Sequence, residues 1–146
     1  MMRHIPIQRI TLVREGTLST PSRLADSAEA VVEIVRDLIG HADREHFIVL
    51  QLDTRNQVTG VHVVSVGHLN ACLIHPREVF KASILANANA IIIVHNHPSG
   101  NPEPSMQDEE TTRRLIEAGD LLGIPVLDHI VIGELGFVSM KQRGLI

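Results

Sequence analysis

Residues 91–94 are four consecutive apolar residues, Ile-Ile-Ile-Val, and this run limits the possible folds more than any other feature of the chain. A strand without a polar face must be covered on both faces, as the central strands of layered sheets are. Residues 47–52 form a second, mostly apolar strand, and residues 58–66 alternate beyond a turn at residues 53–57. This pair of strands predicts a hairpin. We therefore expect an α/β fold in which helices pack against one sheet.

The first helix is expected over residues 26–39. Asp26 and Glu29 form a capping box, in which the two side chains accept the free amide hydrogens of the first turn. Gly40 predicts the end of the helix. The spacing of its apolar residues predicts the face that packs on the sheet, which consists of Val31, Val35, Leu38 and Ile39.

Two more helices and three extended segments follow. Pro76 predicts the start of a helix that runs to about residue 87, because a proline in the first turn lacks only an amide hydrogen that the helix does not use. Another helix is expected from Ser105 to about residue 122. The extended segments are predicted at residues 70–74, 126–132 and 137–140.

Composition narrows the class of protein. The 146 residues correspond to about one domain, which we expect over residues 1–146, with residues 1–20 as an N-terminal arm or edge strand. The single cysteine, Cys72, excludes an internal disulfide and a cysteine-based zinc site. No apolar run approaches the roughly 18 residues of a membrane span. The N-terminus also lacks the apolar core of a signal peptide, so we expect a cytoplasmic protein.

His95 and His97 directly follow the central apolar run. In an extended chain two residues that are two positions apart point to the same side. Two imidazoles presented together at a strand end suit a metal ion, and zinc prefers nitrogen and oxygen ligands. The simpler alternative is that one histidine ends the strand and the other is solvated.

Asp108 favours the metal interpretation. A short, proline-rich loop connects His97 to Ser105, which is expected to cap the third helix, with Asp108 in its first turn. The start of this helix must therefore lie near the histidines. Two histidines and one aspartate leave a fourth tetrahedral position for water, which is typical of a catalytic rather than a structural zinc site. We expect one zinc ion per chain.

Glu45 precedes the apolar strand at residues 47–52. If that strand neighbours the histidine strand, the carboxylate could act as general base toward a water at the fourth position and pass the proton to the leaving group. The alternative is a solvated glutamate in the polar run at residues 44–46. Ser105 Oγ could both cap its helix and donate a hydrogen bond to a developing oxyanion.

The pattern His95-x-His97, Ser105 and Asp108, with an upstream Glu45, resembles the JAMM motif of JAB/MPN-domain metallohydrolases. The surrounding sequence is similar to the RadC branch of that family. The similar segments, which lie between residue 20 and the C-terminus, are Arg44-Glu-His-Phe47, Leu69-Asn70, His75-Pro-Arg-Glu-Val-Phe-Lys81, His95-Asn-His-Pro-Ser-Gly100 and Asp128-His129.

The resemblance implies a JAB/MPN-like curved mixed β-sheet flanked by about three helices, in a cytidine-deaminase-like layout. It also implies zinc ligation by His95, His97 and Asp108, with Glu45 as general acid/base and Ser105 assisting the oxyanion. The implied activity is that of a metallopeptidase or isopeptidase acting on a peptide or isopeptide-type substrate. Glu78 is a rival for the role of Glu45, although it reads more simply as an acid in the first turn of its helix.

Three other residues have candidate roles, and two of them, His75 and His129, have two interpretations each. His75 could be a fourth metal ligand, but a backbone contact at the start of the second helix explains it better. His129 could hydrogen-bond a metal-binding histidine, although we favour an ordinary strand residue with satisfied hydrogen bonds. Asn96 is expected to hold its loop through the side-chain amide.

Two alternative functions follow from the same resemblance. The family label suggests a protein associated with DNA repair or recombination, but 13 Lys and Arg against 17 Asp and Glu give a net charge of −4, which argues against nucleic-acid binding. Longer RadC proteins also carry an N-terminal helix-hairpin-helix region, which residues 1–25 do not resemble. A non-catalytic MPN scaffold is the other alternative, although such domains typically lose motif residues.

An oligomer could form if residues 5–13 and 58–66 pair across chains.

Overall fold

The computed structural model describes residues 1–39, 43–67 and 74–146. The expected helix end at Gly40, Cys72 and most of the extended segment at residues 70–74 lie outside these residues.

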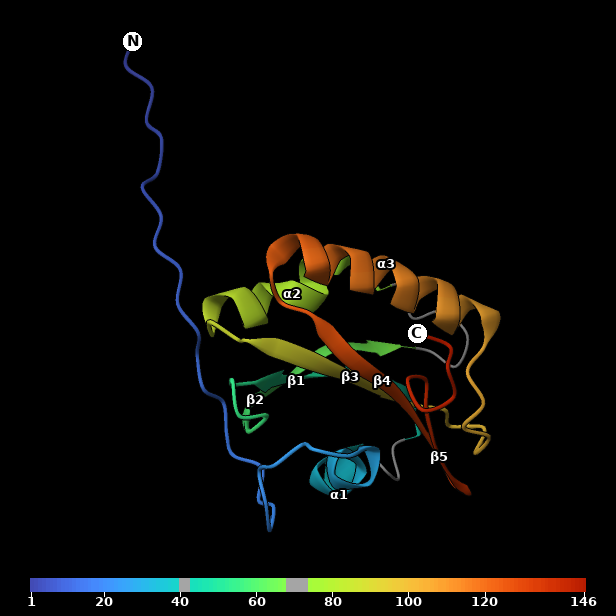
Figure 1. Ribbon diagram of the computed structural model, residues 1–146. Coiled ribbons are helices and arrows are strands. Elements are labelled where there is room, and N and C mark those ends of the chain that lie inside the picture. The colour runs from blue at the N-terminus through green and yellow to red at the C-terminus, as the bar shows by residue number, and fades with distance from the viewer. Residues whose placement is uncertain (40–42, 68–73) are drawn as a thin grey trace.

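The described residues form three helices and five strands, which confirms the α/β fold class (Figure 1). In chain order they are α1 (Ala28–Ile39), β1 (Glu45–Leu52), β2 (Val58–Gly67), α2 (Pro76–Leu85), β3 (Ala90–Asn96), α3 (Met106–Leu122), β4 (Val126–Gly133) and β5 (Gly136–Ser139). None of the helices in this part of the chain has both the length and the apolarity that a membrane crossing needs.

The sheet has the strand order β2-β1-β3-β4-β5. The predicted hairpin of β1 and β2 is present, and β1 also pairs antiparallel with β3. In that second pairing Phe47 lies opposite His95, so the N-terminal end of β1 is beside the C-terminal end of β3. β3 and β4 are parallel and are connected through α3. The beginning of β1, the end of β3 and the beginning of α3 therefore all lie at one end of the sheet.

Helices cover both faces of the sheet, with α1 on one face and α2 and α3 on the other (Figure 1). Alternate residues of β3 divide between these two layers: Ile92 and Val94 pack with α1, whereas Ile91 and Ile93 pack with α2 and α3. All four are buried, as expected for a central strand. His95 continues the row of Ile91 and Ile93, so its side chain is directed into the layer that contains α3.

The first helix begins one residue later than expected. Ser27, not Asp26, is the cap, since Ser27 Oγ accepts the amide hydrogen of Ala30 at 3.1 Å. Serine and aspartate are equally good caps, so the backbone geometry decides which of two neighbours is used. The predicted buried face of α1 is also partly wrong: Leu38 is 37% exposed, whereas Ile34 is buried.

Residues 1–20 form neither helix nor strand. Their N-terminal part runs away from the body of the molecule (Figure 1), whereas Leu18 packs against the core. Ile5 and Ile7 in this arm are 88% and 101% exposed. An isolated bridge between Leu24 and Gln57 joins the segment that enters α1 to the outer edge of the sheet at β2.

Candidate metal centre

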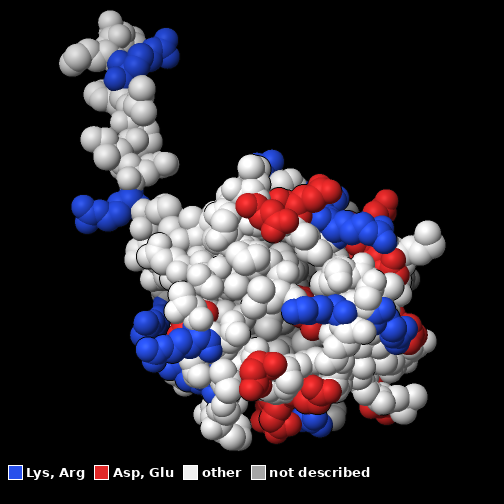
Figure 2. All heavy atoms as spheres, viewed as in Figure 1, with Lys and Arg blue, Asp and Glu red and all other residues white. Residues whose placement is uncertain are grey.

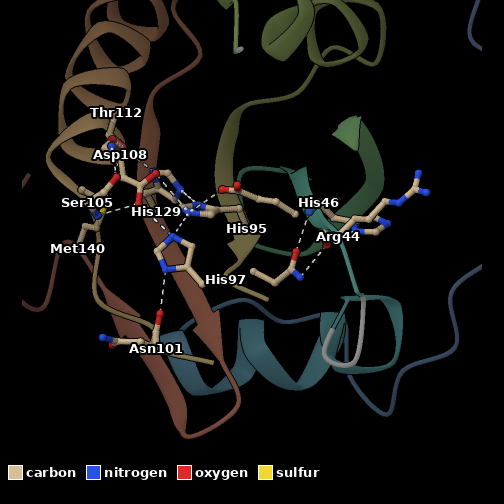
Figure 3. A network of polar contacts seen from close by, with 12 residues as sticks. Arg44, His46, His95, His97, Asn101, Ser105, Asp108, Thr112, His129 and Met140 are labelled. Carbon is tan, nitrogen blue, oxygen red and sulfur yellow. Dashed lines mark hydrogen bonds and ion pairs between the residues drawn. The ribbon is translucent and has the colours of Figure 1, made fainter. Parts of the chain in front are cut away.

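Four predicted site residues, Glu45, His95, His97 and Asp108, lie together at the end of the sheet described above. Figure 3 shows His95, His97 and Asp108 of this cluster. One potential ligand atom from each residue lies within 4.8 Å of the other three. His95 Nε2 is 3.0 Å from His97 Nε2, 3.5 Å from Asp108 Oδ1 and 3.6 Å from Glu45 Oε1. His97 Nε2 is 3.2 Å from Asp108 Oδ2. The sequence thus predicted a cluster that the fold does assemble.

These separations suit a small tetrahedral ion. Zinc bonds to nitrogen and oxygen of about 2.0–2.1 Å place neighbouring ligand atoms about 3.3 Å apart. The two Nε2 atoms are 3.0 Å apart, and each faces its own oxygen of Asp108, His97 at 3.2 Å from Oδ2 and His95 at 3.5 Å from Oδ1; these values lie close to that separation. The cluster can therefore hold a metal ion without a large change in the position of its side chains.

The polarity of the facing atoms also favours a cation. His97 Nδ1 donates a hydrogen bond to the carbonyl oxygen of Asn101 at 2.9 Å, so Nε2 of the neutral ring carries a lone pair. This lone pair faces the Asp108 carboxylate, and the Glu45 carboxylate lies across the cluster. An ionised carboxylate has no hydrogen to donate and can only accept hydrogen bonds. A group of facing acceptors needs a positive charge between its members, either a proton or a metal ion.

Asp108 is fixed by the start of α3. Ser105 Oγ accepts the amide hydrogen of Asp108 at 3.0 Å, and Asp108 Oδ2 accepts the amide hydrogen of Ser105 at 2.8 Å. This reciprocal pair is a capping box, so the predicted helix start at Ser105 is confirmed. The box holds the Asp108 carboxylate at the N-terminus of the helix, pointing toward the two histidines (Figure 3).

The loop between His97 and Ser105 is held on both sides. The amide of His97 donates to Ile132 O in β4, and the amide of Glu134 donates to Gly100 O. A Cβ at Gly133 would collide with Gly100 O, so this close approach requires glycine. Strand β4 therefore fixes the loop that presents His97.

The two carboxylates of the cluster differ in their electrostatics. Burial raises the pKa of Asp108, but contacts with His95 and His97 outweigh it and hold the pKa far below its usual range. Burial raises the pKa of Glu45 above its ordinary value; His95 opposes this shift and Asp108 adds to it. Contact with Asp108 raises the pKa of His97. Asp108 is therefore the permanently ionised carboxylate, and Glu45 is the one that gains a proton more readily.

We expected Asn96 to hold its own loop. Its side chain instead binds the neighbouring strand. Its Oδ1 accepts the amide hydrogen of His46 at 2.7 Å, and its Nδ2 donates to Arg44 O at 3.0 Å. These two backbone groups lie on either side of Glu45. Asn96 thus connects the end of β3 to the segment that carries the Glu45 carboxylate.

For His129 the structure shows the interpretation that we ranked lower. Its side chain is fully buried in β4, and its Nε2 lies 2.6 Å from His95 Nδ1. The contact with a candidate metal-binding histidine, which we considered the weaker interpretation, is therefore present. The preceding Asp128 has a structural role, since it accepts hydrogen bonds from the amide of His129, from Ser139 Oγ and from the amide of Lys141.

Two rival site residues lie outside the cluster. Glu78 is in α2, where it pairs with Lys81 at 2.9 Å on the surface. His75 caps α2, since its Nδ1 accepts the amide hydrogen of Arg77 at 3.1 Å. The backbone interpretation of His75 is therefore confirmed.

A cavity of about 630 Å³ adjoins the cluster. Its walls combine residues of the cluster with neutral polar and apolar side chains: Glu45, Phe47, Ile74, His97, Pro98, Ser99, Ser105, Gln107, Asp108, Thr111 and His129. A molecule in this cavity would contact the facing acceptors directly.

The fold and the site together define a mixed α/β domain with a histidine–carboxylate centre that can hold a metal ion. A family model described as the RadC-like JAB domain matches residues 25–145. The chain belongs to this family.

Similar proteins carry the name UPF0758. The chain is 49% identical to one from Desulfitobacterium hafniense over 121 residues, which are 83% of this chain and 53% of that protein. It is 48% identical to one from Rubrobacter xylanophilus over 134 residues, which are 91% of this chain and 59% of that protein. It is 53% identical to one from Moorella thermoacetica over 116 residues, which are 80% of this chain and 51% of that protein. The chain thus spans between half and three fifths of the length of these relatives.

Proposed function

We propose that the chain is a zinc-dependent hydrolase of the JAMM type that cleaves an amide bond in a peptide or isopeptide. The observation that carries this proposal is the set of facing acceptor atoms at near-tetrahedral separations beside a cavity. His95, His97 and Asp108 are the proposed ligands, and Glu45 is the proposed general acid/base. Membership in the RadC-like JAB family supports the same assignment.

Zinc suits this donor set because it accepts imidazole nitrogen and carboxylate oxygen in a tetrahedral arrangement. Bound there, it would polarise a carbonyl and lower the pKa of a bound water. Two histidines and one aspartate leave one position for that chemistry. Asp108 fits the role of a ligand because its depressed pKa keeps it ionised.

Glu45 fits the role of the proton carrier. Its side chain is 15% exposed, and it lies on the wall of the cavity, so it has access to both a water and a substrate. The raised pKa of Glu45 lies closer to neutral pH, where a carboxyl group can both accept and release a proton during a reaction. In the proposed reaction Glu45 accepts a proton from the attacking water and transfers it to the leaving nitrogen. The products are one carboxylate and one amine.

Ser105 is the proposed donor to the oxyanion. Its bond with the amide of Asp108 uses a lone pair of Oγ, so the hydroxyl hydrogen is not consumed by capping the helix. Ser105 also lines the cavity. A donor at this place would stabilise negative charge that develops on the carbonyl oxygen.

The lining of the cavity also indicates which substrate side chains it can accommodate. Phe47, Ile74 and Pro98 give it apolar surface, and its acidic groups are Glu45 and Asp108. An acidic side chain next to the scissile bond would meet these two carboxylates. We therefore propose a substrate without an acidic residue at that position.

The surface charge supports this proposal over the DNA-binding alternative. On the face shown in Figure 2, Lys and Arg side chains are interspersed with Asp and Glu over the body of the molecule. A protein that follows a phosphate backbone gathers its basic groups in a patch or stripe. The arm at residues 1–20 is the part in which basic groups stand alone in this view (Figure 2).

Removal of the metal tests the proposal. We expect about one zinc per chain by elemental analysis, loss of peptide or isopeptide cleavage after chelation, and recovery when zinc is returned. Cleavage that survives complete chelation would contradict a metal-dependent reaction. A wild-type protein that binds no zinc when zinc is offered would overturn the proposal at its first step.

Replacement of Asn96 tests how Glu45 is positioned. Asn96→Ala removes both bonds to the backbone around Glu45, and we expect cleavage to fall by about 10–100-fold because a small displacement of a catalytic group is costly. The zinc content should not change, since the two bonds lead to β1 and not to the proposed ligands. A combined measurement of kcat and zinc content checks this. Loss of zinc in parallel with kcat would show that Asn96 supports the ligands instead.

A further inference from the structure

A chain of buried polar groups connects His95, through His129 and Thr112, to the start of α3. His129 is 0% exposed and lies between His95 and Thr112, which is also 0% exposed. His129 Nε2 is 2.6 Å from His95 Nδ1, and His129 Nδ1 is 2.6 Å from Thr112 Oγ1. Thr112 Oγ1 is in turn 2.6 Å from Asp108 O, one helical turn earlier in α3 (Figure 3). The chain thus begins at one proposed ligand, His95, and ends at the backbone of another, Asp108.

The direction of each hydrogen bond follows from its last acceptor. A carbonyl oxygen only accepts, so Thr112 donates its single hydroxyl hydrogen to Asp108 O. The sulfur of Met140, 3.7 Å from the same hydroxyl, is a weak and more distant acceptor. Thr112 Oγ1 must then accept from His129 Nδ1–H, which leaves a lone pair on His129 Nε2. His95 Nδ1–H donates to that lone pair, so His95 Nε2 carries a lone pair that faces the centre.

Packing against Phe47 restricts the orientations of the His95 and His129 rings. Phe47 stacks on His95 with ring centroids 5.9 Å apart and contacts the edge of His129 at 5.6 Å. The acceptor that sets the whole chain is a main-chain carbonyl in the first turn of α3, whose position is fixed by the Ser105 capping box. The fixed acceptor Asp108 O therefore determines which ring nitrogen of His95 carries the hydrogen.

The geometry assigns His129 and Thr112 a positioning role: together they fix His95 in the Nδ1–H tautomer, which leaves Nε2 available to a metal ion. This inference rests on the proposed function for its biological purpose, but it concerns a property of the metal-free protein. It predicts that the hydroxyl of Thr112, about two side chains away from the ion, controls metal affinity. Outer groups of this kind typically change metal affinity by about 10–100-fold.

Two substitutions at one position separate the hydroxyl from the shape of the side chain. Thr112→Val replaces the hydroxyl by a methyl group, so His129 Nδ1–H loses its acceptor. The other tautomer of His129 then donates from Nε2 to His95 Nδ1, and the hydrogen of His95 moves to Nε2, where it competes with the metal. We expect zinc to bind about 10–100-fold more weakly to this variant. Thr112→Ser keeps the hydroxyl and should bind zinc with nearly the wild-type affinity.

The direct readout is the tautomer of His95. In metal-free wild-type protein with ¹⁵N-labelled histidine, at a pH where the rings are neutral, two-bond ¹H–¹⁵N correlations should show Nδ1 as the protonated nitrogen of His95. Thr112→Val should show Nε2–H or a mixture, and Thr112→Ser should show the wild-type pattern. Ser83→Ala is the control, because Ser83 Oγ is a buried hydroxyl with no hydrogen-bond partner in the described part of the chain. It should change neither the tautomer nor the zinc affinity.

The outcomes separate the inference from the proposed function. An Nε2–H tautomer of His95 in the metal-free wild type would overturn the inference without any variant, so the test does not depend on whether Thr112→Val folds. Wild-type zinc affinity in a folded Thr112→Val protein would overturn it as well. A wild-type protein with the expected tautomer that binds no zinc would sustain the inference about His95 and sink the proposed function.

Discussion

Replacement of Glu45 by glutamine is expected to reduce hydrolysis by about 10²–10⁴-fold, the usual contribution of a general acid or base. Glutamine has the shape of glutamate but accepts no proton at neutral pH. The zinc content should stay at the wild-type value, since His95, His97 and Asp108 still supply the three proposed ligands. The checks are kcat/KM on a cleavable peptide or isopeptide and elemental analysis of the same sample.

Glu78→Gln is the matched control. Glu78 was the rival candidate for the base, and the structure places it on the surface of α2 in a pair with Lys81. We expect this variant to retain wild-type cleavage. If Glu78→Gln were inactive and Glu45→Gln fully active, the roles of the two glutamates would have to be exchanged, and the geometry of the centre would no longer explain the reaction.

Loss of a proposed ligand should have the second large effect. His97→Ala removes an atom that lies 3.0 Å from His95 Nε2 and 3.2 Å from Asp108 Oδ2. We expect zinc to bind more than about 100-fold more weakly, since even groups behind the ligands change affinity by about 10–100-fold. Cleavage should be lost with the zinc. Competition with a chelator of known affinity measures the first effect, and the peptide assay measures the second.

His62→Ala is the control for a general effect of removing histidine. His62 lies in β2 opposite Val49, outside the cluster. This variant should bind zinc as the wild type does. Equal losses in His62→Ala and His97→Ala would point to general destabilisation of the fold and would remove the support for His97 as a ligand.

Much of the fold could be predicted because several of its signals are local. The buried run at residues 91–94 requires cover on both faces, and Pro76 and Ser105 mark helix starts through the chemistry of a single turn. The cap of α1 was misplaced by one residue, to Asp26 in place of Ser27, because two good capping residues are adjacent and only the backbone path chooses between them. Residues 1–20, which we expected as an arm or an edge strand, form no strand.

The cluster could be predicted because its members are close in sequence or lie on strands that pair. His95 and His97 share one side of the chain, and a short loop leads to Asp108. Glu45 required the additional assumption that β1 neighbours β3, which the pairing of Phe47 with His95 satisfies. The role of His129 required more, because it depends on the parallel register of β3 and β4 across the whole of α3. Its one local signal was a polar residue at a buried position of an apolar strand.

Asn96 is a second residue whose contacts could not be predicted from the local sequence. An asparagine between two histidines at the start of a loop has local hydrogen-bonding partners, so a role within the loop was a reasonable expectation. Its partners are instead the backbone of Arg44 and His46, some 50 positions earlier in the chain. Only the pairing of β1 with β3 brings them within reach.

Under the proposal, the two roles of Asp108 would link the amount of this protein in a cell to the supply of zinc. The same carboxylate caps α3 and faces the histidines, so an ion bound there adds its binding free energy to that of the folded chain. A ligand at 100 times its Kd stabilises a fold by about 2.7 kcal/mol. Differences of about 1–2 kcal/mol already change the steady-state abundance of marginally stable proteins several-fold, because unfolded chains are degraded. Under the proposal, a shortage of zinc would therefore lower the number of molecules as well as the activity of each one.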